Sequence, residues 1–146
     1  MIYMSREKAL KILNEPNGPE KLAAKAEQAF EPAWALYIKE NNAAAGAFFC
    51  RLAKQKKFRE AMAGKLCSAD ENERFCAMLL SDDAKLRKNT ARLMGALERE
   101  ADAPRLIDAL EREQTRFVRP SIILSIGAIG GEEAKAFLEK YTVPAA

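Results

Sequence analysis

Two twelve-residue stretches decide the fold: LRKNTARLMGAL at residues 86–97 and VRPSIILSIGAI at residues 118–129. A shift of 32 positions superimposes them, with arginine in the second place, Gly-Ala in the tenth and eleventh, and apolar residues at both ends. The segments that follow, 103–110 and 134–141, also align, with one residue fewer in the second turn. Helical segments that recur in pairs at this period predict an array of stacked helical units.

A weaker match one step earlier in the chain extends the pattern. It places Gly64 in register with Gly95 and Gly127. A glycine inside a helix costs about 1 kcal/mol relative to alanine, so its recurrence predicts positions where two helices approach closely. The segments before this match do not align with the repeat.

The rest of the chain is typical of short helices joined by tight turns. Ala, Leu, Glu, Lys and Arg dominate, and strand-like alternation is nearly absent. We expect Pro19 in the first turn of a helix, a boundary at Glu31 and Pro32, and N-terminal caps at Asp102 and Thr115. The expected helices span residues 21–30, 33–40, 43–55, 57–66, 71–80, 103–113, 115–129 and 132–141, and one more, opened by Ser81, Asp82 and Asp83, runs to residue 98.

These features predict an all-α fold in a single domain, residues 1–146. Neither helix of a unit can bury its apolar face alone, so neighbouring units stack around one continuous core. We expect about three clear repeats within residues 51–142. Residues 1–50 are expected to form divergent cap helices at the N-terminal end.

The pattern Val-Arg, seven residues, Gly-Ala-Ile, a short turn and a second helix resembles HEAT-like repeats. More narrowly, it resembles the short bacterial type found in phycobilisome-lyase relatives. The resemblance is good over residues 81–141 and fair over 57–80. It implies a right-handed α-α superhelix, a solenoid that presents binding surfaces. Only the repeat type suggests bilin lyase activity. No cysteine of the chain has a reactive context that would support it.

A second resemblance rests on residues 113–124, EQTRFVRPSIIL. This stretch is similar to the HEAT-like head that precedes a THUMP and methyltransferase region in some bacterial RNA-modifying enzymes. The similarity implies that a basic edge of the head helps to hold RNA. Nothing in these residues would bind S-adenosylmethionine, so methyl transfer would lie outside this chain.

The composition excludes several kinds of chemistry. The chain has no histidine, and therefore no Ser-His-Asp or Cys-His pair and no histidine metal ligand. Cys50, Cys67 and Cys76 have apolar neighbours and no paired-cysteine spacing, so we expect small buried residues rather than a disulfide or zinc site. We expect no catalytic residue, no metal and no cofactor. The N-terminus lacks an apolar signal segment and residues 43–50 are too short to span a bilayer, so a cytoplasmic protein without membrane contact is expected.

A base-excision enzyme is a less favoured alternative. HEAT-like DNA glycosylases for alkylated bases use an aspartate together with tryptophans and arginines on a concave surface. This chain has one tryptophan, and its aspartates lie at expected turns or, for Asp108, on an exposed helix face. These residues do not predict a pocket.

Basic residues are the candidate binding residues. Segment 51–65 carries six lysines and arginines against one acid, a net charge of +5. The repeat alignment makes Lys56, Arg87 and Arg119 equivalent, so a solenoid would line them up along one edge. Such a row can contact successive phosphates or an acidic protein segment. The candidate ligand-binding residues are Arg51, Lys54, Lys56, Lys57, Arg59, Arg87, Lys88 and Arg119.

A purely structural interpretation of these charges competes with the functional one. Arginines at the start of a repeat often pair with acids in the neighbouring turn, and solvated ladders of charge are common on helices. We prefer this interpretation for Arg87 and Arg119. For segment 51–65, which lacks other acids close in sequence, both interpretations stay open. The acids available to the two arginines are Asp82, Asp83, Glu111 and Glu113.

The sequence therefore predicts a non-catalytic binding module. A scaffold for protein–protein interaction is the first expectation. The alternative is a module that binds RNA or DNA through its basic edge, within an RNA-modifying methyltransferase if the second resemblance holds. A protein partner is favoured over nucleic acid at this point.

Overall fold

The computed structural model describes residues 3–142, which form helices and turns without a β-strand. The expectation of an all-α fold is confirmed for this part of the chain. The α-helices are α1 (Arg6–Leu13), α2 (Gly18–Ala23), α3 (Ala26–Glu40), α4 (Ala43–Leu52), α5 (Lys56–Lys65), α6 (Ala69–Ala77), α7 (Ala84–Leu97), α8 (Ala103–Arg112), α9 (Arg119–Ile129) and α10 (Gly131–Thr142). Two 3₁₀ turns, η1 (Met78–Leu80) and η2 (Glu100–Asp102), precede α7 and α8.

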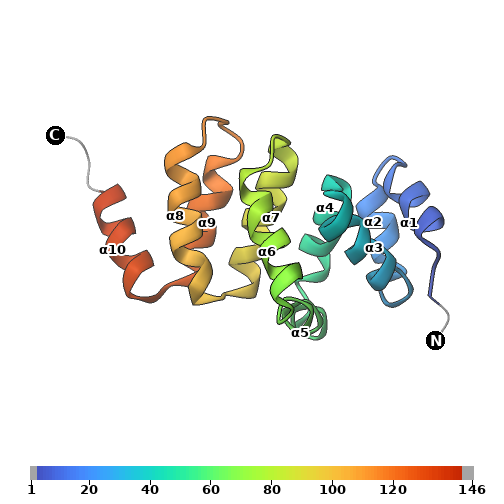
Figure 1. The fold of residues 1–146 in the computed structure, drawn as a ribbon. Helices are drawn as coiled ribbons and strands as arrows, with labels where there is room; N and C mark the ends of the chain where they lie inside the picture. The colour runs from blue at the N-terminus through green and yellow to red at the C-terminus, as the bar shows by residue number, and fades with distance from the viewer. Residues whose placement is uncertain (1–2, 143–146) are drawn as a thin grey trace.

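The helices follow one another along an elongated molecule, with α1 and α10 at opposite ends (Figure 1). Helices α2, α4, α7 and α9 form one row in which each packs on the next. Beside this row, α3 contacts α6, η1 contacts α8, and α8 contacts α10. Neighbours in sequence also pair across the rows, as α3 does with α4 and α8 with α9. Packing between elements close in the chain is compatible with a helical repeat.

Helix α5 lies outside the row that contains α7. Helix α7 packs on α4 and α9, whereas it touches α5 only slightly. The expected alignment of residues 55–66 with residues 86–97 therefore does not describe equivalent places in the packing. Gly64 on α5 has open space where a side chain would lie. The expectation of a close helix approach at Gly64 is wrong.

Gly95 on α7 does mark a close approach between two helices. A Cβ atom at this position would lie 2.8 Å from the Cβ and 2.9 Å from the Cα of Ser125 on α9. Gly46 on α4 has a similar role, since its Cβ would lie 3.2 Å from the Cβ of Asn89 on α7. The sequence analysis missed Gly46 because its helix does not align with the repeat. A side chain at Gly127 would make only ordinary van der Waals contacts. Of the three aligned glycines, Gly95 is therefore the one at which a side chain would clash.

Helix α3 runs without interruption through Pro32, so the expected boundary at Glu31 and Pro32 is wrong. Proline has no N–H to donate to the carbonyl four residues earlier, which belongs to Gln28. The N–H of Met4 donates to that carbonyl oxygen instead, at 3.0 Å. The segment before α1 thus supplies the hydrogen bond that the Gln28 carbonyl oxygen cannot receive from Pro32.

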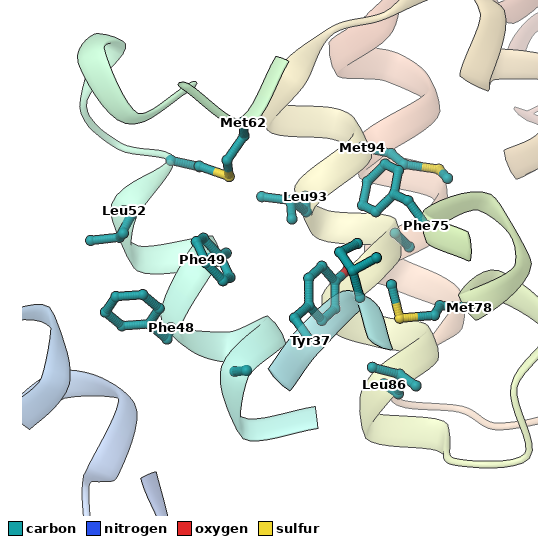
Figure 2. Packing of buried hydrophobic residues seen from close by; sticks show 14 of the residues in the cluster. Tyr37, Phe48, Phe49, Leu52, Met62, Phe75, Met78, Leu86, Leu93 and Met94 are labelled. Carbon is teal, nitrogen blue, oxygen red and sulfur yellow. The ribbon is translucent and has the colours of Figure 1, made fainter. Parts of the chain in front are cut away.

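Aromatic side chains from α3, α4 and α6 pack together in the core (Figure 2). Tyr37 and Phe49 are fully buried with ring centres 5.9 Å apart, and Phe75 lies edge-on to Tyr37 at 6.3 Å. Trp34 is 2% exposed, and its Nε1 donates a hydrogen bond to Glu71 on α6 at 3.0 Å. Full burial of a side chain such as Phe contributes about 1.5–3 kcal/mol. The cluster therefore joins α3, α4 and α6 in one continuous part of the core.

A buried hydrogen bond joins α3 to α7. The hydroxyl oxygens of Tyr37 and Thr90 are 2.8 Å apart, and neither side chain is exposed to solvent. Burial raises the pKa of the Tyr37 phenol far above its ordinary value. The phenol therefore stays neutral and serves packing rather than proton transfer.

The predicted helix caps are partly correct. The carboxylate of Asp83 accepts hydrogen bonds from two N–H groups in the first turn of α7, as expected. Asp102 does not cap α8 with its side chain, because its fully buried carboxylate binds the guanidinium groups of Arg99 and Arg105. The hydroxyl of Thr115 accepts a hydrogen bond from an arginine of α7 instead of capping α9.

Candidate binding surface

An arginine near the start of each of three helices, α5, α7 and α9, makes the same contact with the backbone. In every case Nη1 donates to the carbonyl oxygen six residues earlier, at 2.8 Å. The pairs are Arg59 with Ala53, Arg87 with Ser81, and Arg119 with Glu113. The residue of α5 that corresponds to Arg87 and Arg119 is therefore Arg59 rather than Lys56. These three guanidinium groups hold the turns that precede their helices.

Arg87 is also part of a largely buried ion pair. Its Nε and Nη2 donate to the two carboxylate oxygens of Glu113 at 2.9 and 3.0 Å, and the side chains are 17% and 4% exposed. The Arg87 hydrogen bond is the main reason why the pKa of Glu113 lies below its ordinary value, and a bond from the Thr115 N–H adds to it. The acid pairing expected for Arg87 is therefore present. Arg119 differs, because its guanidinium donates to the backbone carbonyl oxygens of Leu110 and Glu113 rather than to an acidic side chain.

Three of the six basic residues of segment 51–65 pair with acids from earlier helices. Lys57 lies 2.8 Å from Glu27, and Lys65 lies 2.6 Å from Glu31, both on α3. Arg51 is 3.7 Å from Glu20 on α2, and Lys56 is 3.8 Å from Glu60 on its own helix. The segment lacks acids only along the sequence, because folding brings those of α2 and α3 beside it.

A groove of about 700 Å³ lies along α2, α4 and α7 and reaches the turn before α9. Its lining includes one acid, Glu20, and five basic residues. We call this surface the basic groove and define it by these five residues: Arg51 on α4, Lys54 in the turn after α4, and Lys85, Lys88 and Arg92 on α7. Of the eight candidate residues from the sequence, it includes Arg51, Lys54 and Lys88.

Four cations of the basic groove have no acidic partner. Within residues 3–142, Lys54, Lys85, Lys88 and Arg92 take part in no ion pair. Lys85, Lys88 and Arg92 follow the three-and-four spacing that places residues on one face of a helix. Lys85 lies in the first turn of α7, where a cation opposes the helix dipole, so helix stability does not explain its position. The groove therefore concentrates positive charge that the described fold does not neutralise.

An exposed aromatic ring borders the basic groove. Phe117, in the turn before α9, lines the groove and is 51% exposed. The ammonium group of Lys88 lies 5.9 Å from the centre of the ring. Lys85, Arg92 and Phe117 are absent from the candidate residues predicted by sequence. Their exposure cannot be read from composition, although the spacing of cations on α7 points to one helix face.

The cysteines have different surroundings, and one of them lies in the groove. Cys50 lines it but is mostly buried, and its thiol donates to the Asn89 carbonyl oxygen at 3.2 Å. Burial raises the pKa of the Cys50 thiol to about 11, so the thiol is protonated near neutral pH. Cys76 is partly buried, whereas Cys67 is exposed. The expectation of burial is therefore wrong for Cys67.

The opposite end of the molecule carries a surface of the other sign. A cavity of about 990 Å³ lies around the start of α10, lined by Glu100, Glu132, Glu133 and Glu139 together with Lys135. No group of three or more acidic or cysteine side chains in the described part of the chain could hold a metal ion. The two hollows thus divide the surface by charge, and only the basic one includes predicted site residues.

The comparisons with known proteins assign no family. No family model matches the chain, and no curated protein matches it significantly. Within residues 3–142, no helix combines the length and apolar character needed to cross a membrane.

Proposed function

We propose that the chain is a non-catalytic, right-handed HEAT-like repeat module that binds nucleic acid in the basic groove. The observation that carries the proposal is the group of four cations without acidic partners, Lys54, Lys85, Lys88 and Arg92, on one groove. Nucleic acid presents closely spaced phosphates, which such a group neutralises with release of counterions. The sequence analysis favoured a protein partner, and the charge of this groove shifts the preference to nucleic acid.

The repeat itself is supported by sequence and packing together. Residues 86–97 and 118–129, which align in sequence, form α7 and α9, and these helices pack on each other in the same row. The helices that follow them, α8 and α10, also contact each other. In addition, Arg87 and Arg119 repeat the same backbone contact six residues back. The structural equivalence therefore supports two clear units.

The decisive measurement is binding at varied salt concentration. Fluorescence anisotropy with a labelled single strand and a labelled duplex, from about 50 to 200 mM salt, should give a linear fall of log K with log salt. Four phosphate contacts correspond to a slope of about −3 for a single strand. Lys85→Ala, Lys88→Ala and Arg92→Ala should each weaken binding and each reduce the slope by about 0.7 for a single strand.

Lys56→Ala is the matched control. Lys56 is 80% exposed, lies outside the basic groove, and pairs only with Glu60 on its own helix, so its loss should leave the slope unchanged. Absence of binding at low salt would overturn the proposal. A slope that responds equally to Lys56→Ala and Lys88→Ala would do the same. Binding of an acidic peptide but of no nucleic acid would favour the protein-scaffold alternative instead.

A further inference from the structure

Phe117 lies at the edge of a charged groove, where an exposed aromatic ring has no evident structural role. The Phe117 side chain is half exposed, and the Lys88 ammonium group lies 5.9 Å from the centre of its ring. Exposed apolar residues that occur singly are common on protein surfaces. An aromatic ring beside unpaired cations, however, is the combination by which proteins bind single-stranded nucleic acid.

Two apolar residues that follow Phe117 in the chain are also exposed. Pro120 and Leu124 follow Phe117 at three- and four-residue intervals, and both are exposed, Leu124 by 73%. The face of α7 that carries Lys85, Lys88 and Arg92 contributes charge, while the turn into α9 contributes apolar surface. The groove thus has a basic wall and, at Phe117, an apolar edge.

The dimensions of the basic wall fit a short run of phosphates. Lys85 and Arg92 are seven residues apart on α7, which corresponds to about 10 Å along the helix axis. A nucleic acid strand advances about 3.4 Å per nucleotide in a duplex. Three such steps cover this length, so the three cations of α7 span about four successive phosphates of a strand that is stacked as in a duplex.

The Phe117 ring can distinguish single-stranded from duplex nucleic acid, which the charges alone cannot do. Lysine and arginine contact phosphates of single strands and duplexes alike. An unpaired base exposes its flat faces and can stack on an aromatic side chain, whereas the bases of a duplex are stacked on each other. Phe117 therefore favours a strand whose bases are accessible.

We propose that the basic groove holds single-stranded nucleic acid, with phosphates along Lys85, Lys88 and Arg92 and one base stacked on Phe117. The inference rests on the proposed function and adds the strand type and a base contact to it. Stacking on phenylalanine uses the face that every base has, so the interaction is not specific for sequence. RNA and DNA strands share this chemistry.

The test compares strands of twelve nucleotides with a duplex of the same length, as RNA and as DNA. Phe117→Ala should weaken single-strand binding by about 5- to 150-fold, the range expected for the loss of one stacked base. Duplex binding by the same variant should change less than twofold. Phe117→Trp, which keeps a stacking surface, should retain single-strand affinity. Circular dichroism of each variant verifies the helical fold.

Leu80→Ala provides the matched control, because Leu80 is 55% exposed, similar to Phe117, and lies outside the groove. It should leave all affinities unchanged. Equal affinity of the wild-type protein for single strand and duplex would overturn the inference, and so would unaltered single-strand binding by Phe117→Ala. Either result, with binding still sensitive to Lys88→Ala, leaves the proposed function intact. Absence of any nucleic acid binding would remove both.

Discussion

At the scale of the residue, Gly95 shows how a single missing side chain sets the distance between two helices. The backbone of α9 comes so close at Ser125 that a Cβ on Gly95 would lie 2.9 Å from a Cα atom. A backbone atom cannot move aside as a flexible side chain does, so the two helices would have to separate. Gly64 on α5 provides the contrast, since it meets nothing within 4 Å.

We therefore expect opposite effects from the same substitution at these two glycines. Gly95→Ala should lower the free energy of unfolding by about 1–3 kcal/mol, as overpacked cores do. Gly64→Ala should leave it unchanged or raise it by up to about 1 kcal/mol, because alanine is the better helix former. Urea unfolding monitored by circular dichroism measures both. Equal destabilisation by the two variants would contradict the close approach of α7 and α9.

The recurring arginine shows what the sequence could predict of single residues. Arg87 and Arg119 were matched because they stand in the second place of two similar stretches. Arg59 makes the same contact, but it lies in a helix that does not pack in the same row, so alignment chose Lys56 in its place. The contact depends on the shape of the preceding turn, which a one-dimensional match between helices does not include.

At the scale of the element, the pair of Arg87 and Glu113 fastens α7 to the turn between α8 and α9. Glu113 is almost completely buried, and Arg87 gives it two hydrogen bonds. Hydrogen bonds to charged groups are stronger than those between neutral groups. This pair therefore fixes the distance between successive units rather than stabilising one helix.

Glu113→Gln should cost about 1.5–3 kcal/mol of unfolding free energy near neutral pH. The pKa of Glu113 is lowered by folding, so its contribution is fully present above the unfolded value of about 4.3 and is lost as the pH falls through the native value. The difference between wild type and Glu113→Gln should thus be constant from pH 6 to 8 and shrink below about pH 4.

Glu60→Gln is the control for this prediction. It removes the exposed pair with Lys56, which is worth about 0.3–0.5 kcal/mol. Chemical denaturation at several pH values measures both variants. A Glu113→Gln difference that grew as the pH fell would contradict the role given to the carboxylate.

Most helix positions were predictable from the sequence, but the expected helix 21–30 is wrong, because α2 ends at Ala23 and a separate helix, α3, begins at Ala26. Asp83 caps α7 as its short carboxylate suggests, and Pro19 lies in the first turn of α2. Pro32 was predicted to end a helix because proline lacks an N–H, but Met4 supplies a donor to the carbonyl concerned. Met4 precedes Pro32 by 28 positions, so no local sequence pattern reveals this donor.

At the scale of the whole molecule, helices at the two ends pack against fewer neighbouring helices than those in the middle do. Helix α7 has seven buried residues and packs on both α4 and α9. Helix α10 packs mainly on α8 and α9, and Ala134 is its fully buried residue among the described side chains. Stability in such arrays is the sum of units and of interfaces with neighbours.

Hydrogen exchange of the native protein should therefore differ between the middle of the molecule and its C-terminal end. Amides of α10 should open at a lower free energy than those of α7, because opening of α10 disrupts only its packing on α8 and α9. Mass spectrometry of peptic fragments, or amide-resolved NMR, measures the difference. Equal protection of α10 and α7 would indicate one cooperative unit instead.

The basic groove is a property of the whole molecule, which explains why the sequence predicted it only in part. Segment 51–65 was predicted as a binding segment because its positive charges lie close together in the sequence. In the structure, however, Lys57 and Lys65 are paired with acids of α3. The unpaired cations come from the turn after α4, at Lys54, and from α7, whose first residue is thirty positions further along the chain. Burial and pairing in the folded chain, rather than local charge density, select the residues that remain available.

The only tryptophan of the chain, Trp34, is an intrinsic fluorescence probe of the N-terminal half of the molecule. Trp34 is enclosed by Phe30 and Phe49 and donates its indole N–H to Glu71, so its emission reports the region where α3, α4 and α6 meet. Loss of α9 and α10 alone would leave that emission almost unchanged while the circular dichroism signal falls. Comparing the two signals during denaturation therefore shows directly whether the two halves of the molecule unfold together or one after the other.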